Sequence, residues 1–106
     1  MKEQFNWPEP WWHLGENAKI KSCVQKELER EIGPRHPLWT LKPIAIAKSD
    51  ANDDVIVQLS DGRFACVHLV WHGKIDPHPD KFPSSIIFDC VESLQSYIDE
   101  EANEYT

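Results

Sequence analysis

The segment from residue 43 to residue 71 constrains the fold more than any other part of the chain. Apolar residues alternate along it on both sides of Asp61-Gly62. A period of two is typical of β-strands, and Asp-Gly favours the type I′ turn of a two-residue hairpin, because both central residues need positive φ. Both faces of this hairpin are largely apolar, so we expect both to be covered. The predicted register pairs Ser60 with Arg63, Leu59 with Phe64, Val57 with Cys66 and Val55 with His68.

Two further strands and two helices are predicted around this hairpin. Residues 44–47 form a strand that precedes it, and residues 84–89 form a short fourth strand. Residues 16–32 carry apolar side chains at spacings of three and four, which is typical of an amphipathic helix that ends at Gly33-Pro34. This apolar stripe consists of Ile20, Cys23, Val24, Leu28 and Ile32.

A second helix is expected after the fourth strand. Asp89 with Glu92 matches a capping box, which makes Asp89 the predicted N-cap. Val91, Leu94, Tyr97 and Ile98 form its apolar face, and the acidic end from residue 99 is expected to fray.

These elements predict a single α+β domain over residues 1–106. We expect a four-stranded, mainly antiparallel sheet, a meander plus a short fourth strand, with the N-terminal and C-terminal helices packed on one face. Residues 1–14 form an aromatic, proline-containing arm. Each aromatic side chain can bury about 150–250 Å², so the arm either covers the second face or forms an exposed patch for a partner. The aromatic residues of the arm are Phe5, Trp7, Trp11 and Trp12.

Charge and cysteine content limit the partners and the compartment. The 106 residues include 11 basic and 18 acidic side chains, a formal net charge of -7. Such a surface repels nucleic-acid phosphates and attracts cationic partners. No window approaches the roughly 18 apolar residues of a membrane span, and we expect neither a membrane partner nor a secretory leader. Cys23, Cys66 and Cys90 are odd in number and widely separated, which favours reduced thiols and a cytoplasmic protein.

The histidines near the hairpin allow two interpretations. On a strand, His68 and His72 stand about 13 Å apart, too far to bind one ion. We therefore expect His68 to be a core histidine bonded to the backbone, Cys66 to be a buried and inert thiol, and the chain to have no catalytic residue, metal or cofactor. The turn at 50–54, with three aspartates, is expected to be solvated. The alternative is a small metal-dependent or histidine-using enzyme built around Cys66, His68, His72 and His78, with Asp76 as a base.

Residues 36–73 resemble a group of small bacterial proteins. The shared pattern joins His36-Pro37-Leu38, an Asp-Asp pair before a strand, Asp61-Gly62-Arg63 and the strand Val67-His68-Leu69 that ends in Trp71. Members commonly have threonine where Val70 stands here. The resemblance implies a bacterial globular unit, carries over no catalytic residue, and is similar in character to toxin-immunity proteins.

A binding protein is the function that these observations favour. We expect an acidic inhibitor, such as an immunity protein, that neutralises a basic toxin domain, for example a nuclease, by direct binding. Tryptophan is enriched in interface hot spots, and the densest acidic group follows residue 98. A further alternative is an accessory subunit whose tryptophan arm docks on a larger assembly. The expected partner-binding residues are Trp11, Trp12, Asp99, Glu100, Glu101 and Glu104.

Overall fold

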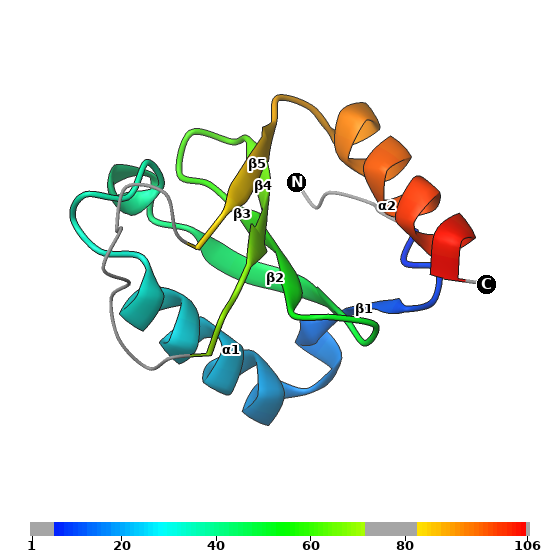
Figure 1. The fold of residues 1–106 in the computed structure, drawn as a ribbon, viewed down its shortest axis with the longest axis horizontal. Helices are drawn as coiled ribbons and strands as arrows, with labels where there is room; N and C mark the ends of the chain where they lie inside the picture. The colour runs from blue at the N-terminus through cyan, green and yellow to red at the C-terminus, as the bar shows by residue number, and fades with distance from the viewer. Residues whose placement is uncertain (1–5, 72–82, 106) are drawn as a thin grey trace.

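Within the described residues, five antiparallel strands form one sheet, with a helix on each side (Figure 1). The computed structural model describes residues 6–71 and 83–105. The α+β class and the antiparallel sheet are confirmed, whereas the predicted number of four strands is wrong. The elements in chain order are β1 (Trp11–His13), a 3₁₀-helix (Leu14–Glu16), α1 (Ala18–Glu31), a second 3₁₀-helix (Trp39–Leu41), β2 (Ile44–Ser49), β3 (Asp54–Gln58), β4 (Phe64–His68), β5 (Ser85–Phe88) and α2 (Val91–Tyr105).

The additional strand comes from the N-terminal arm. β1 pairs with β2 through Trp11 opposite Ser49 and His13 opposite Ala47, and the strand order is β1-β2-β3-β4-β5. The arm is therefore partly built into the sheet, and of its aromatic residues Phe5 lies outside the described residues. Three residues among prolines are too short a segment for alternation to reveal a strand.

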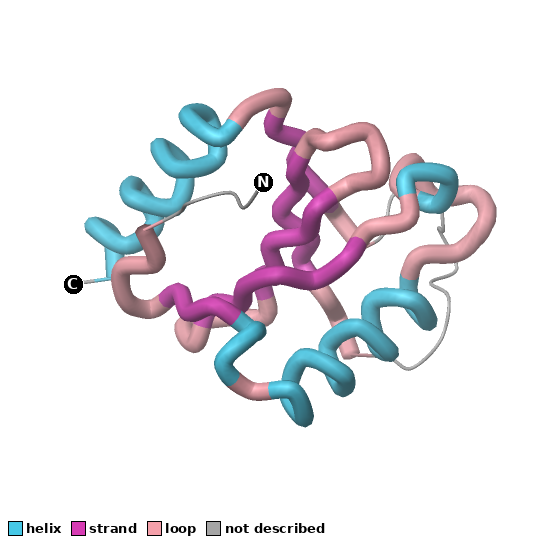
Figure 2. Tube along the Cα trace, turned by 180° about the vertical axis from the view of Figure 1, so that it is seen from behind, coloured by secondary structure: helices cyan, strands magenta, loops and turns pink. Residues whose placement is uncertain are grey.

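The two helices cover opposite faces of the sheet, so the expectation that both pack on one face is wrong. Figure 2 shows the sheet between them from behind. We call the two sides the α1 face and the α2 face. Because the hairpin strands are apolar on both faces, each face needs its own cover. The α1-face cluster includes Val24, Leu28, Ile32, Val55, Val57, Ala65 and Val67. The α2-face cluster includes Trp11, Ala47, Ile56, Phe64, Cys66, Leu94 and Ile98.

The hairpin register differs by one residue from the prediction. Val57 pairs with Ala65, and Ile56 pairs with Cys66. The loop has three residues, 60–62, because Leu59 N–H donates to the Arg63 carbonyl at 2.8 Å. Gly62 alone among them has positive φ, +92°, whereas a type I′ turn needs two such residues. A one-residue shift moves every side chain to the other face.

Both helices depart from the expected boundaries and faces. Asn17 caps α1, its Oδ1 accepting from Ile20 N–H at 3.1 Å. The buried side of α1 includes Glu27 and Glu31, while Cys23 is exposed. The residue directly before α2 is Cys90 and not the predicted cap Asp89, and α2 continues through the acidic end that we expected to fray, up to Tyr105.

No helix in the described ranges is long and apolar enough to span a lipid bilayer.

Candidate binding site

A cleft of about 390 Å³, lined by both polar and apolar side chains, lies between the β4–β5 strands and α2. Its floor is built by a row of residues: Asp54 on β3 pairs with His68 on β4, and His68 N–H donates at 2.9 Å to the carbonyl of Ser84, the residue directly before β5. Side chains in such a row share one face of the sheet, here the α2 face. The cleft is lined by Asp54, Cys66, His68, Ser84, Ser85, Ile86 and Tyr97.

Asp54 and His68 form a close pair at one end of the cleft. Oδ1 of Asp54 lies 2.6 Å from Nδ1 of His68. Asp54 is only 7% exposed, whereas the His68 side chain is 52% exposed. Because a carboxylate accepts, Nδ1–H donates, which leaves Nε2 of the ring as the atom that can bind another group.

This pair corrects two expectations. His68 is not a core histidine bonded to the backbone, because its ring is half exposed and bonds a carboxylate. Asp54 does not belong to a solvated turn, although Asp50 and Asp53 beside it are exposed. The sequence signal that could have found the pair is the register, since the shift by one residue places Asp54 opposite His68.

Cys66 and Tyr97 form the wall of the cleft near α2. Cys66 is buried, and its Sγ–H donates to Tyr97 Oη at 3.8 Å. Burial, and then the nearby Asp54 charge, raise the pKa of Cys66 to about 12, and burial also raises the pKa of Tyr97. A nucleophilic or metal-binding cysteine acts as the thiolate, which this site disfavours at neutral pH. The prediction that Cys66 is a buried thiol is confirmed.

Within residues 6–71 and 83–105, no three His, Cys, Asp or Glu side chains come close enough together to hold a metal ion. His72, Asp76 and His78, which the enzyme alternative requires, lie outside the described residues. That alternative therefore stays a prediction.

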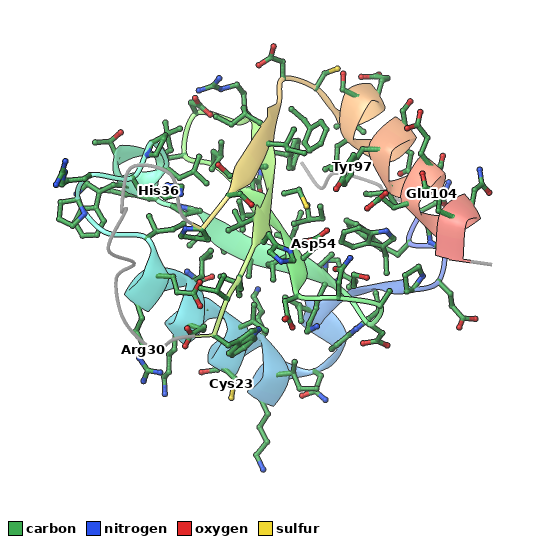
Figure 3. All side chains as sticks on the ribbon, in the orientation of Figure 1. Cys23, Arg30, His36, Asp54, Tyr97 and Glu104 are labelled. Atoms are coloured by element: carbon green, nitrogen blue, oxygen red, sulfur yellow. The ribbon has the colours of Figure 1, made fainter. Side chains whose placement is uncertain are left out.

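The acidic residues of α2 divide between two sides of the helix. Glu100, Glu101 and Glu104 follow Tyr97 at spacings of three and four, so they share its side of α2, and Tyr97 O–H donates to Glu101 Oε1 at 3.5 Å. We call these three glutamates the acidic stripe. Asp99 lies toward another side and accepts from Gln95 Nε2 at 3.0 Å. Figure 3 shows Tyr97 and Glu104 on α2, and Asp54 on the sheet.

The tryptophans expected at a partner interface contribute little surface. Trp11 is buried in the α2-face cluster, and within the described residues its Nε1 is a buried atom with no hydrogen-bond partner. Trp12 is half-buried, and its Nε1 donates to Asp50 Oδ1 at 2.9 Å. This part of the arm is docked on the sheet, and a role for either indole in binding stays a prediction.

A larger, mostly apolar groove of about 530 Å³ lies between α1 and the start of β2. Gln25 fills its polar part: it donates to the Pro43 carbonyl at 3.1 Å and accepts from Ala45 N–H at 2.8 Å. Glu29 and Lys42 also line the groove, and their opposite charges select neither a cationic nor an anionic partner. The smaller cleft is the better candidate site.

Among the described residues, the buried histidine is His36, at the start of the segment that carries the bacterial resemblance. Its Nδ1 accepts from Leu38 N–H at 3.0 Å, and its Nε2 lies 2.7 Å from the Pro83 carbonyl. Since Nδ1 accepts, Nε2–H donates to that carbonyl. His36 thus ties the chain after α1 to the start of β5, which is a structural role.

The chain matches no protein-family model, no curated protein and no solved structure.

Proposed function

We propose that this protein binds a basic protein partner through the acidic stripe and the adjoining cleft, and that it acts in the cytoplasm as an inhibitor of the immunity-protein type. The partner would be a basic toxin domain, for example a nuclease. The observation that carries the proposal is the position of the stripe. Glu101 accepts a hydrogen bond from Tyr97, which lines a cleft that also contains the carboxylate of Asp54, and Glu100 and Glu104 follow Tyr97 at helical spacing. α2 contains no basic residue.

Charge and thiol chemistry support this proposal. Acidic surfaces speed the association of a cationic partner and disfavour anionic ones, including nucleic acids. Cys23, Cys66 and Cys90 are free, as is usual for proteins in a reducing compartment. The neutral thiol and phenol of the cleft favour hydrogen bonding to a partner over covalent catalysis.

Charge reversal on the two sides of α2 tests the proposal. The probe is the protein encoded by the neighbouring reading frame in the source genome, because inhibitors of this type are usually encoded beside their targets. The double variant Glu100→Lys with Glu104→Lys should slow association at low ionic strength by about tenfold or more, with a smaller effect in high salt.

The matched control is Glu92→Lys with Asp99→Lys, which makes the same charge change away from the cleft. It should alter the association rate by less than about threefold. Equal slowing by both double variants would mean that only net charge acts. An unchanged rate in the stripe variant would remove the stripe from the interface.

One observation favours a second candidate function, a histidine-using enzyme. The Asp54–His68 pair orients the ring and leaves Nε2 for a substrate, as in general-base catalysis. Hydrolysis of p-nitrophenyl acetate tests this function. It should be faster than with free imidazole at the same concentration and should be lost in His68→Gln, whereas a rate equal to that of imidazole contradicts catalysis.

A further inference from the structure

β5 is an edge of the sheet, and its outward backbone groups can be identified from the ladder. His68 N–H donates to the Ser84 carbonyl at 2.9 Å, and Cys66 pairs with Ile86. Hydrogen-bonded and non-bonded pairs alternate along an antiparallel ladder, so Ile86 bonds to β4. The N–H and C=O groups of Ser85 and Ile87 therefore point away from the sheet. Among the described residues, neither has a backbone hydrogen-bond partner at this edge.

Within the described residues, the side chains of β5 do not protect this edge against pairing with another chain, although the strand is only four residues long. Proteins commonly protect edge strands with charged side chains, proline or bulges, and β5, Ser85–Phe88, contains none of these. Ile86 and Ile87 are 51% and 39% exposed. The opposite edge, β1, is only three residues long. An apolar strand with free backbone groups is the feature that β-strand addition requires.

The cleft opens beside this edge. A strand added to β5 would lie about 4.8 Å from it, in line with the row Asp54–His68–Ser84. The added residue opposite Ser84 would share the α2 face with that row. A Lys or Arg side chain at this position would extend over Ser84 toward the Asp54–His68 pair. Tyr97, which lines the same cleft, contacts Glu101 of the acidic stripe. Because the acidic groups at the cleft attract positive charge, we expect the added strand to be a basic segment.

We propose that β5 accepts an extended basic segment of the partner as a sixth strand, with one Lys or Arg side chain in the cleft. This inference rests on the proposed function and specifies how binding occurs. Main-chain hydrogen bonds to Ser85 and Ile87 supply affinity, and the cleft selects the cationic side chain.

Synthetic peptides test the pairing on the intact protein. The probe is acetyl-Lys-Val-Lys-Val-Lys-Val-Lys-amide, together with two versions N-methylated at alternate amides and one with Glu in place of Lys. The parent peptide should bind and should slow hydrogen exchange of the Ser85 and Ile87 amides by about tenfold or more. The Ile86 amide, already bonded to β4, should change little. One N-methylated version should bind like the parent and the other should not, because only alternate amides of an added strand face β5.

A pair of variants at one position tests the same bonds from the other side. Ile87→Pro removes an outward N–H, a substitution that edge strands tolerate, and should weaken peptide binding by about tenfold or more. Ile87→Ala keeps the N–H and should weaken binding by less than about threefold. The N-methylated peptides, measured on the unaltered chain, keep the test valid if Ile87→Pro does not fold.

The outcomes separate this inference from the proposed function. Equal binding of both N-methylated peptides, lost in the stripe variant, overturns strand addition and leaves the proposed function standing. If the Glu peptide binds as tightly as the parent peptide, charge does not select the partner, which overturns that part of the inference and of the proposed function. No binding of the parent peptide overturns strand addition, while the neighbouring gene product still tests the function. If hydrogen exchange of the Ser85 and Ile87 amides slows as the protein concentration rises in the absence of peptide, a second copy of the chain occupies this edge. That result also overturns the proposal.

Discussion

Both faces of the sheet bury acidic side chains, and Glu31 on the α1 face and Asp54 on the α2 face have different partners. On the α1 side, Glu31 is 1% exposed and accepts from Val70 N–H at 2.9 Å and Trp71 N–H at 2.7 Å. On the α2 side, Asp54 bonds a half-exposed histidine at an open cleft. The first carboxylate satisfies the protein's own backbone and serves the fold. The second belongs to a pair that reaches solvent, where a partner can bind.

The contrast explains why α1 buries charged residues that its pattern did not predict. Trp71 has φ +58°, a left-handed conformation that is costly for a large side chain. The two backbone hydrogen bonds to Glu31 stabilise this turn at the end of the hairpin. Glu27, one helical turn earlier, shares a hydrogen bond with Glu31. The buried acidic side chains on the α1 face are thus required by the fold, because Glu31 bonds the backbone of this turn and Glu27 bonds Glu31.

Two matched truncations test whether the α1 face carries more of the stability. Leu28 and Leu94 are both fully buried, one in each cluster. We expect Leu28→Ala to lower the free energy of unfolding by about 3–4 kcal/mol and Leu94→Ala by about 2–3 kcal/mol. The reason is that the α1-face cluster is the larger of the two: within the described residues it contains twelve buried residues, against seven in the α2-face cluster, so a truncation there loses more packing. Urea unfolding measures both values, and an equal or larger loss in Leu94→Ala would contradict the contrast.

Changing pH tests the carboxyl pair of the α1 face. Burial, and then the hydrogen bond with Glu27, raise the pKa of Glu31 from 4.5 to about 7. The folded protein therefore holds this proton more tightly than the unfolded chain does. As pH rises from about 4.5 to about 7, Glu31 should reduce the free energy of unfolding, by an amount on the order of 2 kcal/mol.

Glu31→Gln should flatten this pH dependence, because an amide does not titrate in this range, while Glu29→Gln on the exposed side of α1 should leave it intact. Urea unfolding at several pH values gives the slope for each variant. A slope that is the same in Glu31→Gln and in the parent protein would assign the titration to other groups.

The sequence predicted the parts of this molecule that depend on local patterns. The hairpin strands and both helices follow from periodicity within a few turns, whereas the helical order of the acidic end of α2 was not predicted. The register was wrong because one φ value, at Gly62, decides between a two-residue and a three-residue loop. The site depends on that register, since the Asp54–His68 pair joins residues 14 positions apart. Burial of Asp54 was not predictable from its neighbours, because it arises from strand pairing.

The smallest expected change in stability is that of removing the Tyr97 hydroxyl. This variant gives the sharpest test of whether the polar groups of the α2 face serve binding or the fold. Its contacts are long: 3.8 Å from Cys66 Sγ and 3.5 Å to Glu101 Oε1. Such weak bonds contribute little, so Tyr97→Phe should change the free energy of unfolding by less than about 0.5 kcal/mol. If the cleft is kept polar for a partner, the same substitution should still weaken partner binding by about threefold or more. Urea unfolding and calorimetric titration on one variant separate the two roles. A loss of stability with unchanged binding would mean that the α2 face, like the α1 face, holds its polar groups for the fold.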